Sequence, residues 1–302
     1  GADTITFASN VSGTITLTSG SLHIYDAVDI QGPGAGVLTI AGGTQVTRPS
    51  APSYYNSQTS DIVIGYSGGG GNKPAATLAA TPVTISGVTI TGGYSGKGGG
   101  IYANNTLLTI TSCNVTGNTA YYSGGGVYIA GYYSALTVNN STISNNTAGN
   151  TGGGLATTDS AITVNQSSVT GNTAGRGGGI HAHNDNANAL TVTASTVSGN
   201  TSTGSYSYSN TGGGGVYTRH MSTSISNSTI ANNTSEAGQG GGFGNYVDGS
   251  NYYSTTLGNS TVSGNSAPYG GGVSENSDRA FVLSNSVVAG NTAASPNPDP
   301  AP

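Results

Sequence analysis

The chain has 302 residues, of which 52 are glycine and only 6% are charged, and its formal net charge is −5. Two lysines and four arginines are too few for the basic surface that nucleic-acid binding requires, or for a basic membrane-binding patch. No apolar run approaches the roughly 20 residues of a membrane-spanning helix.

A chain rich in glycine and poor in apolar residues is often disordered, but here the apolar residues recur in register. Sparse charge with abundant Thr, Asn, Gly and Tyr fits a secreted or cell-surface protein. The sequence starts at Gly1 rather than Met, as expected after removal of a signal peptide, although an engineered start would look the same. Cys113 is the only cysteine, so no intramolecular disulfide is possible.

Residues 1–93 are irregular, and we interpret them as an amino-terminal cap followed by the first coils of a repeat. A cap is expected because the open end of stacked strands is an unpaired sheet edge. Residues 47–61, rich in Tyr and Ser, are predicted to protrude as a loop. Strand-like alternation of apolar and polar residues occurs at residues 4–7, 14–17, 37–40 and 83–90.

Residues 94–293 repeat with a period of roughly 27 residues. A Gly-Gly-Gly-hydrophobic anchor ends at Ile101, Val127, Leu155, Ile180, Val216, Phe243 and Val273. A second anchor, hydrophobic-x-x-Asn followed by Thr or Ser, places its asparagine at Asn118, Asn146, Asn172, Asn200, Asn233, Asn265 and Asn291. A short alternating run, such as residues 136–138, lies between the two anchors. Residues 204–210 and 248–253 are longer insertions, predicted to protrude like residues 47–61.

Three short strands in each period correspond to one turn of a three-sided parallel β-helix. Each strand alternates inward apolar and outward polar residues. One coil cannot bury its apolar side alone, so coils must stack about 4.8 Å apart. We therefore predict an all-β fold, a single parallel β-helix (solenoid) of roughly nine to ten three-strand coils.

Backbone geometry explains both anchors without a ligand. Asparagine tolerates positive φ at a sharp turn, and its amide can bond the asparagines above and below it. Glycine permits tight or left-handed backbone at a corner. The same stacking predicts that Cys113 is a small interior side chain rather than a reactive thiol. It falls in register with Ser141, Ser167, Ser195, Ser228, Ser260 and Ser286.

Residues 81–93, the anchor at residues 98–101 and the segment Ser-Cys-Asn-Val-Thr-Gly-Asn-Thr-Ala at 112–120 are typical of a known group of repeats. They resemble the Gly-Gly-Ala-Ile and Phe-x-x-Asn repeats of chlamydial polymorphic outer-membrane proteins, with Val or Ile in place of Phe. They are more similar to bacterial and archaeal right-handed parallel β-helix repeat proteins. The resemblance covers roughly residues 10–293 and implies a right-handed solenoid, export and a surface location. It carries no catalytic motif, because these repeats define none.

A polysaccharide lyase or hydrolase on this scaffold would need clustered carboxylates on one strand face. The 11 acidic residues are dispersed, and no two from the regular repeats occupy equivalent strand positions in adjacent coils. We therefore expect neither an enzyme nor a cofactor.

The best candidate for a site is an outward stripe of aromatic and basic side chains. Alternation places His181 and His183 outward together, and the next coil sets Tyr217 beside His181 and Arg219 beside His183. With Asp185 the two histidines could bind a transition metal. The stripe, which includes Tyr102 and Tyr128, could instead contact a saccharide or a protein, or be a plain solvated face.

The last recognisable coil, residues 281–293, is followed by the Pro-rich segment 294–302, which cannot form a β ladder. An end-to-end contact between copies through such an open coil repeats indefinitely and builds a filament. We therefore expect a structural protein that self-assembles into an extracellular filament or sheath. The alternatives are a monomeric adhesin or glycan-binding surface protein and, less favoured, a polysaccharide-processing enzyme.

Overall fold

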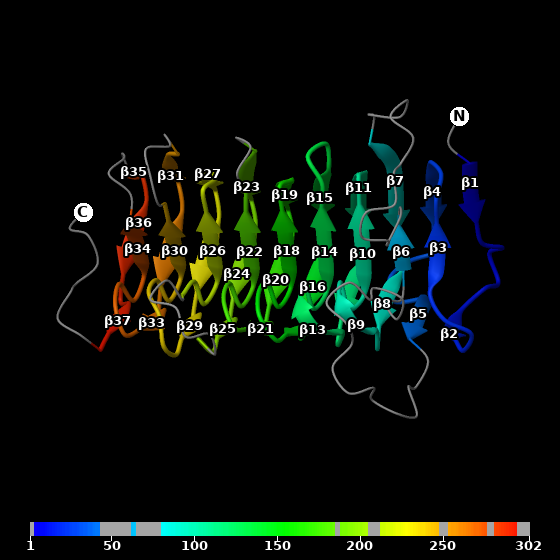
Figure 1. Cartoon of the computed structure of the whole chain (residues 1–302), viewed down its shortest axis with the longest axis horizontal. Coiled ribbons are helices and arrows are strands. Elements are labelled where there is room, and N and C mark those ends of the chain that lie inside the picture. Colours follow the sequence, from blue (N-terminus) through cyan, green and yellow to red (C-terminus); the bar gives the residue numbers. More distant parts are fainter. Residues whose placement is uncertain are drawn as a thin grey trace.

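The computed structural model describes residues 3–42, 62–64, 80–184, 188–204, 212–247, 253–276 and 281–294. These residues form a parallel β-solenoid of about 8 turns and contain no helix. The turns stack along the long axis of a rod, with β1 and β37 at its opposite ends (Figure 1).

Four parallel sheets run along the rod. In stacking order, sheet A contains β1 (Asp3–Thr6), β4 (Val28–Gln31), β7 (Thr81–Ser86), β11 (Thr106–Thr111), β15 (Ala135–Asn139), β19 (Ala161–Asn165), β23 (Ala189–Thr193), β27 (Ser222–Ser226), β31 (Thr255–Gly258) and β35 (Phe281–Ser284). Sheet B contains β2 (Gly13–Leu17), β5 (Leu38–Gly42), β8 (Thr89–Thr91), β12 (Asn114–Thr116), β16 (Thr142–Ser144), β20 (Ser168–Thr170), β24 (Thr196–Ser198), β28 (Thr229–Ala231), β32 (Thr261–Ser263) and β36 (Val287–Ala289).

The other two sheets have fewer strands in the described part of the chain. Sheet C contains β3 (Leu22–Ile24), β6 (Ile62–Ile64), β10 (Ile101–Asn104), β14 (Val127–Ala130), β18 (Leu155–Thr158), β22 (Ile180–His183), β26 (Val216–Arg219), β30 (Phe243–Tyr246) and β34 (Val273–Asn276). Sheet D contains β9 (Tyr94–Lys97), β13 (Thr119–Ser123), β17 (Thr147–Ala148), β21 (Thr173–Ala174), β25 (Thr201–Ser202), β29 (Thr234–Ser235), β33 (Ser266–Ala267) and β37 (Thr292–Ala293).

The predicted all-β parallel solenoid is confirmed, but two details of the prediction are wrong. There are about 8 turns rather than nine to ten. The regular coils also have four strands rather than three, because sheet D forms directly after the asparagine anchor. Most strands of sheet D have only two residues, too few for an alternating pattern to reveal them. The predicted protruding segments 47–61, 204–210 and 248–253 lie outside the described residues, apart from their edges, as do residues 295–302.

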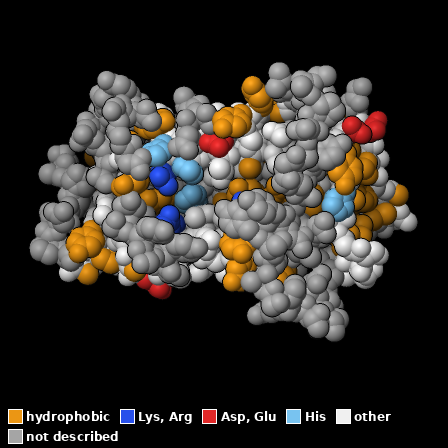
Figure 2. Space-filling model, viewed as in Figure 1, with side chains coloured by type: hydrophobic (Ala, Val, Ile, Leu, Met, Phe, Trp, Pro, Cys, Tyr) orange, Lys and Arg blue, Asp and Glu red, His pale blue; other side chains and the backbone are white. Residues whose placement is uncertain are grey.

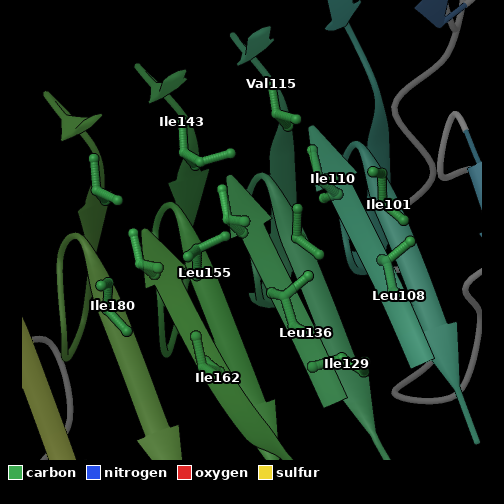
Figure 3. Close-up of a cluster of buried hydrophobic side chains, with 14 of the residues drawn as sticks. Ile101, Leu108, Ile110, Val115, Ile129, Leu136, Ile143, Leu155, Ile162 and Ile180 are labelled. Carbon is green, nitrogen blue, oxygen red and sulfur yellow. The ribbon is translucent and has the colours of Figure 1, made fainter. Parts of the chain in front are cut away.

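The core consists of columns of aliphatic side chains that run along the rod, and Figure 3 shows part of these columns. Parallel pairing places equivalent residues of successive coils on top of one another, as with Val127, Leu155 and Ile180 on sheet C. All three are fully buried. Each coil therefore buries its apolar side against its neighbours, as the repeat predicts. The columns drawn in Figure 3 include Ile101, Leu108, Ile110, Val115, Ile129, Leu136, Ile143, Leu155, Ile162 and Ile180.

Cys113 occupies the predicted ladder of small interior residues. Its backbone N–H donates to the Ser141 hydroxyl at 3.1 Å, and Ser141 makes the same bond to Ser167 at 3.1 Å. The bond recurs between successive serines as far as Ser286. Burial raises the pKa of the Cys113 thiol, which agrees with a packing role.

A ladder of buried asparagine amides joins every regular coil to the next. The Asn172 side-chain amide donates to Asn200 Oδ1 at 2.9 Å and to the Ile143 carbonyl at 3.0 Å. Its own oxygen accepts the backbone and side-chain N–H groups of Asn146, both at 3.0 Å. The hydrogen-bonding capacity of this amide is therefore fully used although the residue is fully buried.

Positive φ was predicted for these ladder asparagines, and this is wrong. The left-handed backbone belongs to the preceding residue, such as Asn145 (φ 54°) or Gly171 (φ 63°). The turn therefore ends before the ladder residue, whose side chain is left pointing inward to bond along the stack.

The three glycines of each anchor meet three different requirements, as Gly152, Gly153 and Gly154 illustrate. Gly152 adopts φ 61°, which disfavours a side chain. A Cβ on Gly153 would lie 2.6 Å from backbone atoms of Thr173 in the same coil. A Cβ on Gly154 would lie 2.8 Å from the Gly179 carbonyl and 3.1 Å from the Asn172 amide nitrogen. The anchor therefore leaves room for the asparagine ladder.

Replacing Asn172 with Ala should lower the free energy of unfolding by about 3 kcal/mol or more, because buried donors and an acceptor lose their partners. The ladder-end variant Asn291→Ala should cost less, since Asn291 is only half-buried and bonds within the described chain only to the coil before it. Urea unfolding of both variants gives the comparison. Equal losses of unfolding free energy in the two variants would contradict the asparagine ladder as the cause of the destabilisation.

Gly154→Ala should destabilise the protein by about 1–3 kcal/mol, because the added methyl meets backbone and the ladder amide. The matched control is Gly36→Ala, where the added methyl meets nothing within 4 Å. That variant should stay within about 1 kcal/mol of the parent protein. Thermal or urea unfolding of the pair measures the difference, and a neutral Gly154→Ala would refute the close approach.

Candidate functional site

The predicted stripe lies along the outer face of sheet C, in the register that the sequence predicts. Tyr102 pairs with Tyr128 in the next coil, and His181 pairs with Tyr217. His183 stands beside Arg219 in the same pair of strands, β22 and β26. The predicted neighbours are therefore confirmed, although Ala156 interrupts the rings between Tyr128 and His181.

The stripe is much less exposed than a solvated face would be. Tyr128, His181 and Tyr217 are only 5%, 7% and 4% exposed. Rings in adjacent coils cover one another: Tyr102 stacks on Tyr128 at 5.8 Å and 21°, and His181 on Tyr217 at 5.5 Å and 18°. The interpretation of the stripe as a plain solvated face is therefore wrong for Tyr128, His181 and Tyr217. Tyr102, His183 and Arg219 remain half-buried at its margins.

Lys97 lies beside the amino-terminal part of the stripe. The Lys97 ammonium lies 4.8 Å from the centre of the Tyr128 ring and donates to its hydroxyl at 3.3 Å. The Tyr128 hydroxyl in turn donates to Thr158 at 3.2 Å. Burial raises the pKa of both Tyr102 and Tyr128, so these rings remain neutral phenols.

Sequence reasoning missed two basic residues that join the stripe. Arg176 precedes the glycine anchor of the His181 coil and acts electrostatically on the His181 ring. His220 turns with φ 51° at the end of β26, which brings its ring to 5.9 Å from that of His183. The sequence places Arg176 next to the glycine anchor of the same repeat, and this position could have predicted that it joins the stripe. No pattern in the sequence indicates that the chain turns at His220.

Five basic side chains thus gather on one face over β22 and β26, as Figure 2 shows for the histidine and Lys/Arg side chains. We call them the cationic cluster. It contains three of the four histidines and two of the six Lys and Arg residues of the whole chain. Its members are Arg176, His181, His183, Arg219 and His220.

His181 is the buried centre of the cationic cluster. Burial, followed by repulsion from His183, Arg176 and Arg219, lowers its pKa to about 3. The imidazole is therefore neutral at physiological pH, whereas the arginines around it are charged. Its Nδ1 atom is buried and has no hydrogen-bond partner among the residues that the structure describes.

A transition-metal site was one alternative for His181, His183 and Asp185. Asp185 lies outside the described residues. Among the residues that the structure describes, no three His, Cys, Asp or Glu side chains are grouped as metal ligands. We therefore base no mechanism on a metal.

The two ends of the rod form a second candidate surface. At the amino-terminal end, the inward residues Ile5 and Ile15 are 47% and 42% exposed. At the other end, Phe281, Leu283 and Val288 are only partly buried, whereas their equivalents in the coil before are buried. Both ends thus expose side chains that inner coils bury.

Comparison with protein-family models, curated proteins and solved structures finds no match to this chain. No helix in the described part of the chain is long and apolar enough to cross a membrane.

The depressed pKa of His181 should make folding stability depend on pH. The unfolded histidine takes up a proton near its usual pKa of 6.5 and the folded one only near 3, so acid favours the unfolded chain across this interval. His181→Phe, which keeps a ring but cannot titrate, should lose less stability than the parent protein between about pH 6.5 and 3. Urea unfolding across this pH range measures the difference. If the unfolding free energies of the parent protein and the variant fell in parallel with pH, the lowered pKa of His181 would be contradicted.

Proposed function

We propose that the chain is a secreted or cell-surface structural solenoid that assembles end to end into a filament or sheath. The observation that carries the proposal is the exposure of core-type side chains at both ends of the rod. The sparsely charged composition, rich in Thr, Asn and Gly, supports an extracellular location.

Two apolar columns match in register at the two ends, whereas the sheet A column that ends at Phe281 begins at Asp3. Ile5 is the first residue of the sheet A column whose last residue is Leu283. Ile15 is the first residue of the sheet B column whose last residue is Val288. If β1 of one copy paired with β35 of another, Ile5 would rest on Leu283 as Ile30 rests on Ile5 within one copy. Such pairing would bury these side chains and satisfy edge N–H and C=O groups.

The geometry of such a contact favours a filament over a closed dimer. The surfaces at the two ends are different, so the contact is heterologous and leaves a free end on each copy. Successive copies would then continue the same columns along one axis. Nothing in this arrangement uses the outer faces of the sheets, which stay available for other contacts.

Blocking one end should abolish assembly without unfolding the rod. The double variant Ile5→Lys and Ile15→Lys places ammonium groups at two exposed inward positions, where stacking would bury them without partners. The matched control is Tyr132→Lys with Tyr133→Lys, at side chains 65% and 59% exposed beyond β14. Electron microscopy and analytical ultracentrifugation at rising protein concentration measure the assemblies.

The parent protein and the control variant should form concentration-dependent rods longer than one copy. The end-blocked variant should remain monomeric with an unchanged circular dichroism spectrum. Parent protein that stays monomeric at all concentrations would refute end-to-end assembly, as would end-blocked protein that assembles like the control.

A further inference from the structure

One inward position at the amino-terminal end of the rod carries an acidic residue. Asp3 is the first residue of the sheet A column whose last residue is Phe281. In the six coils that follow Asp3 this position is Val, Leu or Ile, and in the next two it is Thr. A single copy leaves Asp3 exposed, so its carboxylate is in contact with water.

End-to-end stacking would change the surroundings of this carboxylate. β1 and β35 are the end strands of sheet A, at opposite ends of the rod (Figure 1). If β1 of one copy paired with β35 of another, Asp3 would lie between Phe281 of that copy and its own neighbour Val28, which is only 9% exposed. A carboxylate placed between apolar side chains loses its hydration and gains no partner there.

The described acidic groups around this position would add to the cost. Glu275 lies in the column beside that of Phe281, because Asn245, its pairing partner, contacts Thr255, the pairing partner of Phe281, at 3.4 Å. The other described acidic residues on elements that pack against β1 are Asp26 and Asp29, before and on β4.

The described basic groups lie elsewhere. His23 is exposed and alternates along β3 with the inward residue Ile24, so it faces outward. The lysine and arginine residues that the structure describes are on inner coils, from β9 to β26, at Lys97, Arg176 and Arg219. The described residues therefore supply no cation to Asp3 at the contact between two rods.

An inward charge on an end strand is one means by which proteins limit pairing between sheet edges. Here it acts against the exposed Ile5 and Ile15 at the same end of the rod, whose burial would favour stacking. The balance between these two effects changes when the carboxylate takes up a proton, because the neutral carboxyl group costs less to bury.

We propose that Asp3 makes end-to-end assembly sensitive to acid: its ionised carboxylate weakens stacking, and its protonated form permits it. Asp3 acts through the end-to-end contact, so this role rests on the proposed function. Burial disfavours the charged form of a carboxyl group, so the stacked state binds more protons than the free rods. Assembly therefore strengthens as the pH falls from neutral into the range where carboxyl groups protonate.

Analytical ultracentrifugation of the parent protein over a series of concentrations, at about pH 7 and about pH 4, tests this role. The concentration at half-assembly should fall at least about tenfold in acid, since one proton taken up per contact changes the association constant by up to about tenfold per pH unit. Electron microscopy checks that the assemblies are rods one copy wide.

Variants at constant pH separate Asp3 from the general loss of net charge in acid. Asp3→Asn keeps the size of the side chain but cannot ionise, and at about pH 7 it should reach half-assembly at a concentration about tenfold below that of the parent protein or lower. Asp3→Val supplies the residue found at Val28 and should assemble at a still lower concentration. Circular dichroism confirms that each variant is folded.

Glu236→Gln is the matched control, because it removes one carboxylate at an exposed residue after β29 on an inner coil. It should assemble like the parent protein at both pH values. Asp3 does not control assembly if the parent protein assembles equally at both pH values, if Asp3→Asn assembles like the parent protein at about pH 7, or if Glu236→Gln strengthens assembly as much as Asp3→Asn.

A different result would refute end-to-end assembly itself. In that case neither the parent protein nor Asp3→Val would form rods at any concentration or pH tested, and the proposed role of Asp3 would fall with it. Rods that form without regard to pH or to Asp3 would refute the acid sensitivity alone. The two failures are therefore told apart.

Discussion

The asparagine ladder is the interaction on which the rest of the structure depends. A buried amide is tolerated only when its donors and acceptor are satisfied, and in Asn172 the partners come from the coil before and the coil after. Each coil therefore needs a neighbour with the same residue at the same height. This requirement explains why Gly154, whose Cβ would press on the ladder amide, has an equivalent glycine in every regular coil.

Because the ladder and the core columns fix coil spacing from inside, the outer faces are free to vary. On sheet C the same outward position carries Tyr128, Ala156, His181 and Tyr217 in four successive coils. Inward neighbours in these strands remain small or aliphatic. Chemical variety is therefore concentrated where it does not disturb the stack, and the cationic cluster lies at such a place.

The sequence predicts best the features that recur in every regular coil. Stacked columns, the serine ladder at Cys113 and the pairing of His181 with Tyr217 all follow once the repeats are aligned. It predicts poorly the features that depend on backbone geometry within a single coil. The two-residue strands of sheet D have no periodicity to detect, and the positive φ falls one residue before the ladder asparagine. The environment of His181 depends on ring stacking with Tyr217 in the next coil and on the charge of Arg176, and alternation along one strand encodes neither.

The proposed end-to-end contact is constrained by the geometry of the rod. Sheet A has ten strands in the described part of the chain, so pairing of β35 with β1 of the next copy would repeat the copies every ten strand spacings of about 4.8 Å, or about 48 Å. An outward side chain of any coil would then recur at this spacing along one side of the filament. A partner that spans several copies would bind the filament with an avidity above its affinity for one copy, without any new contact.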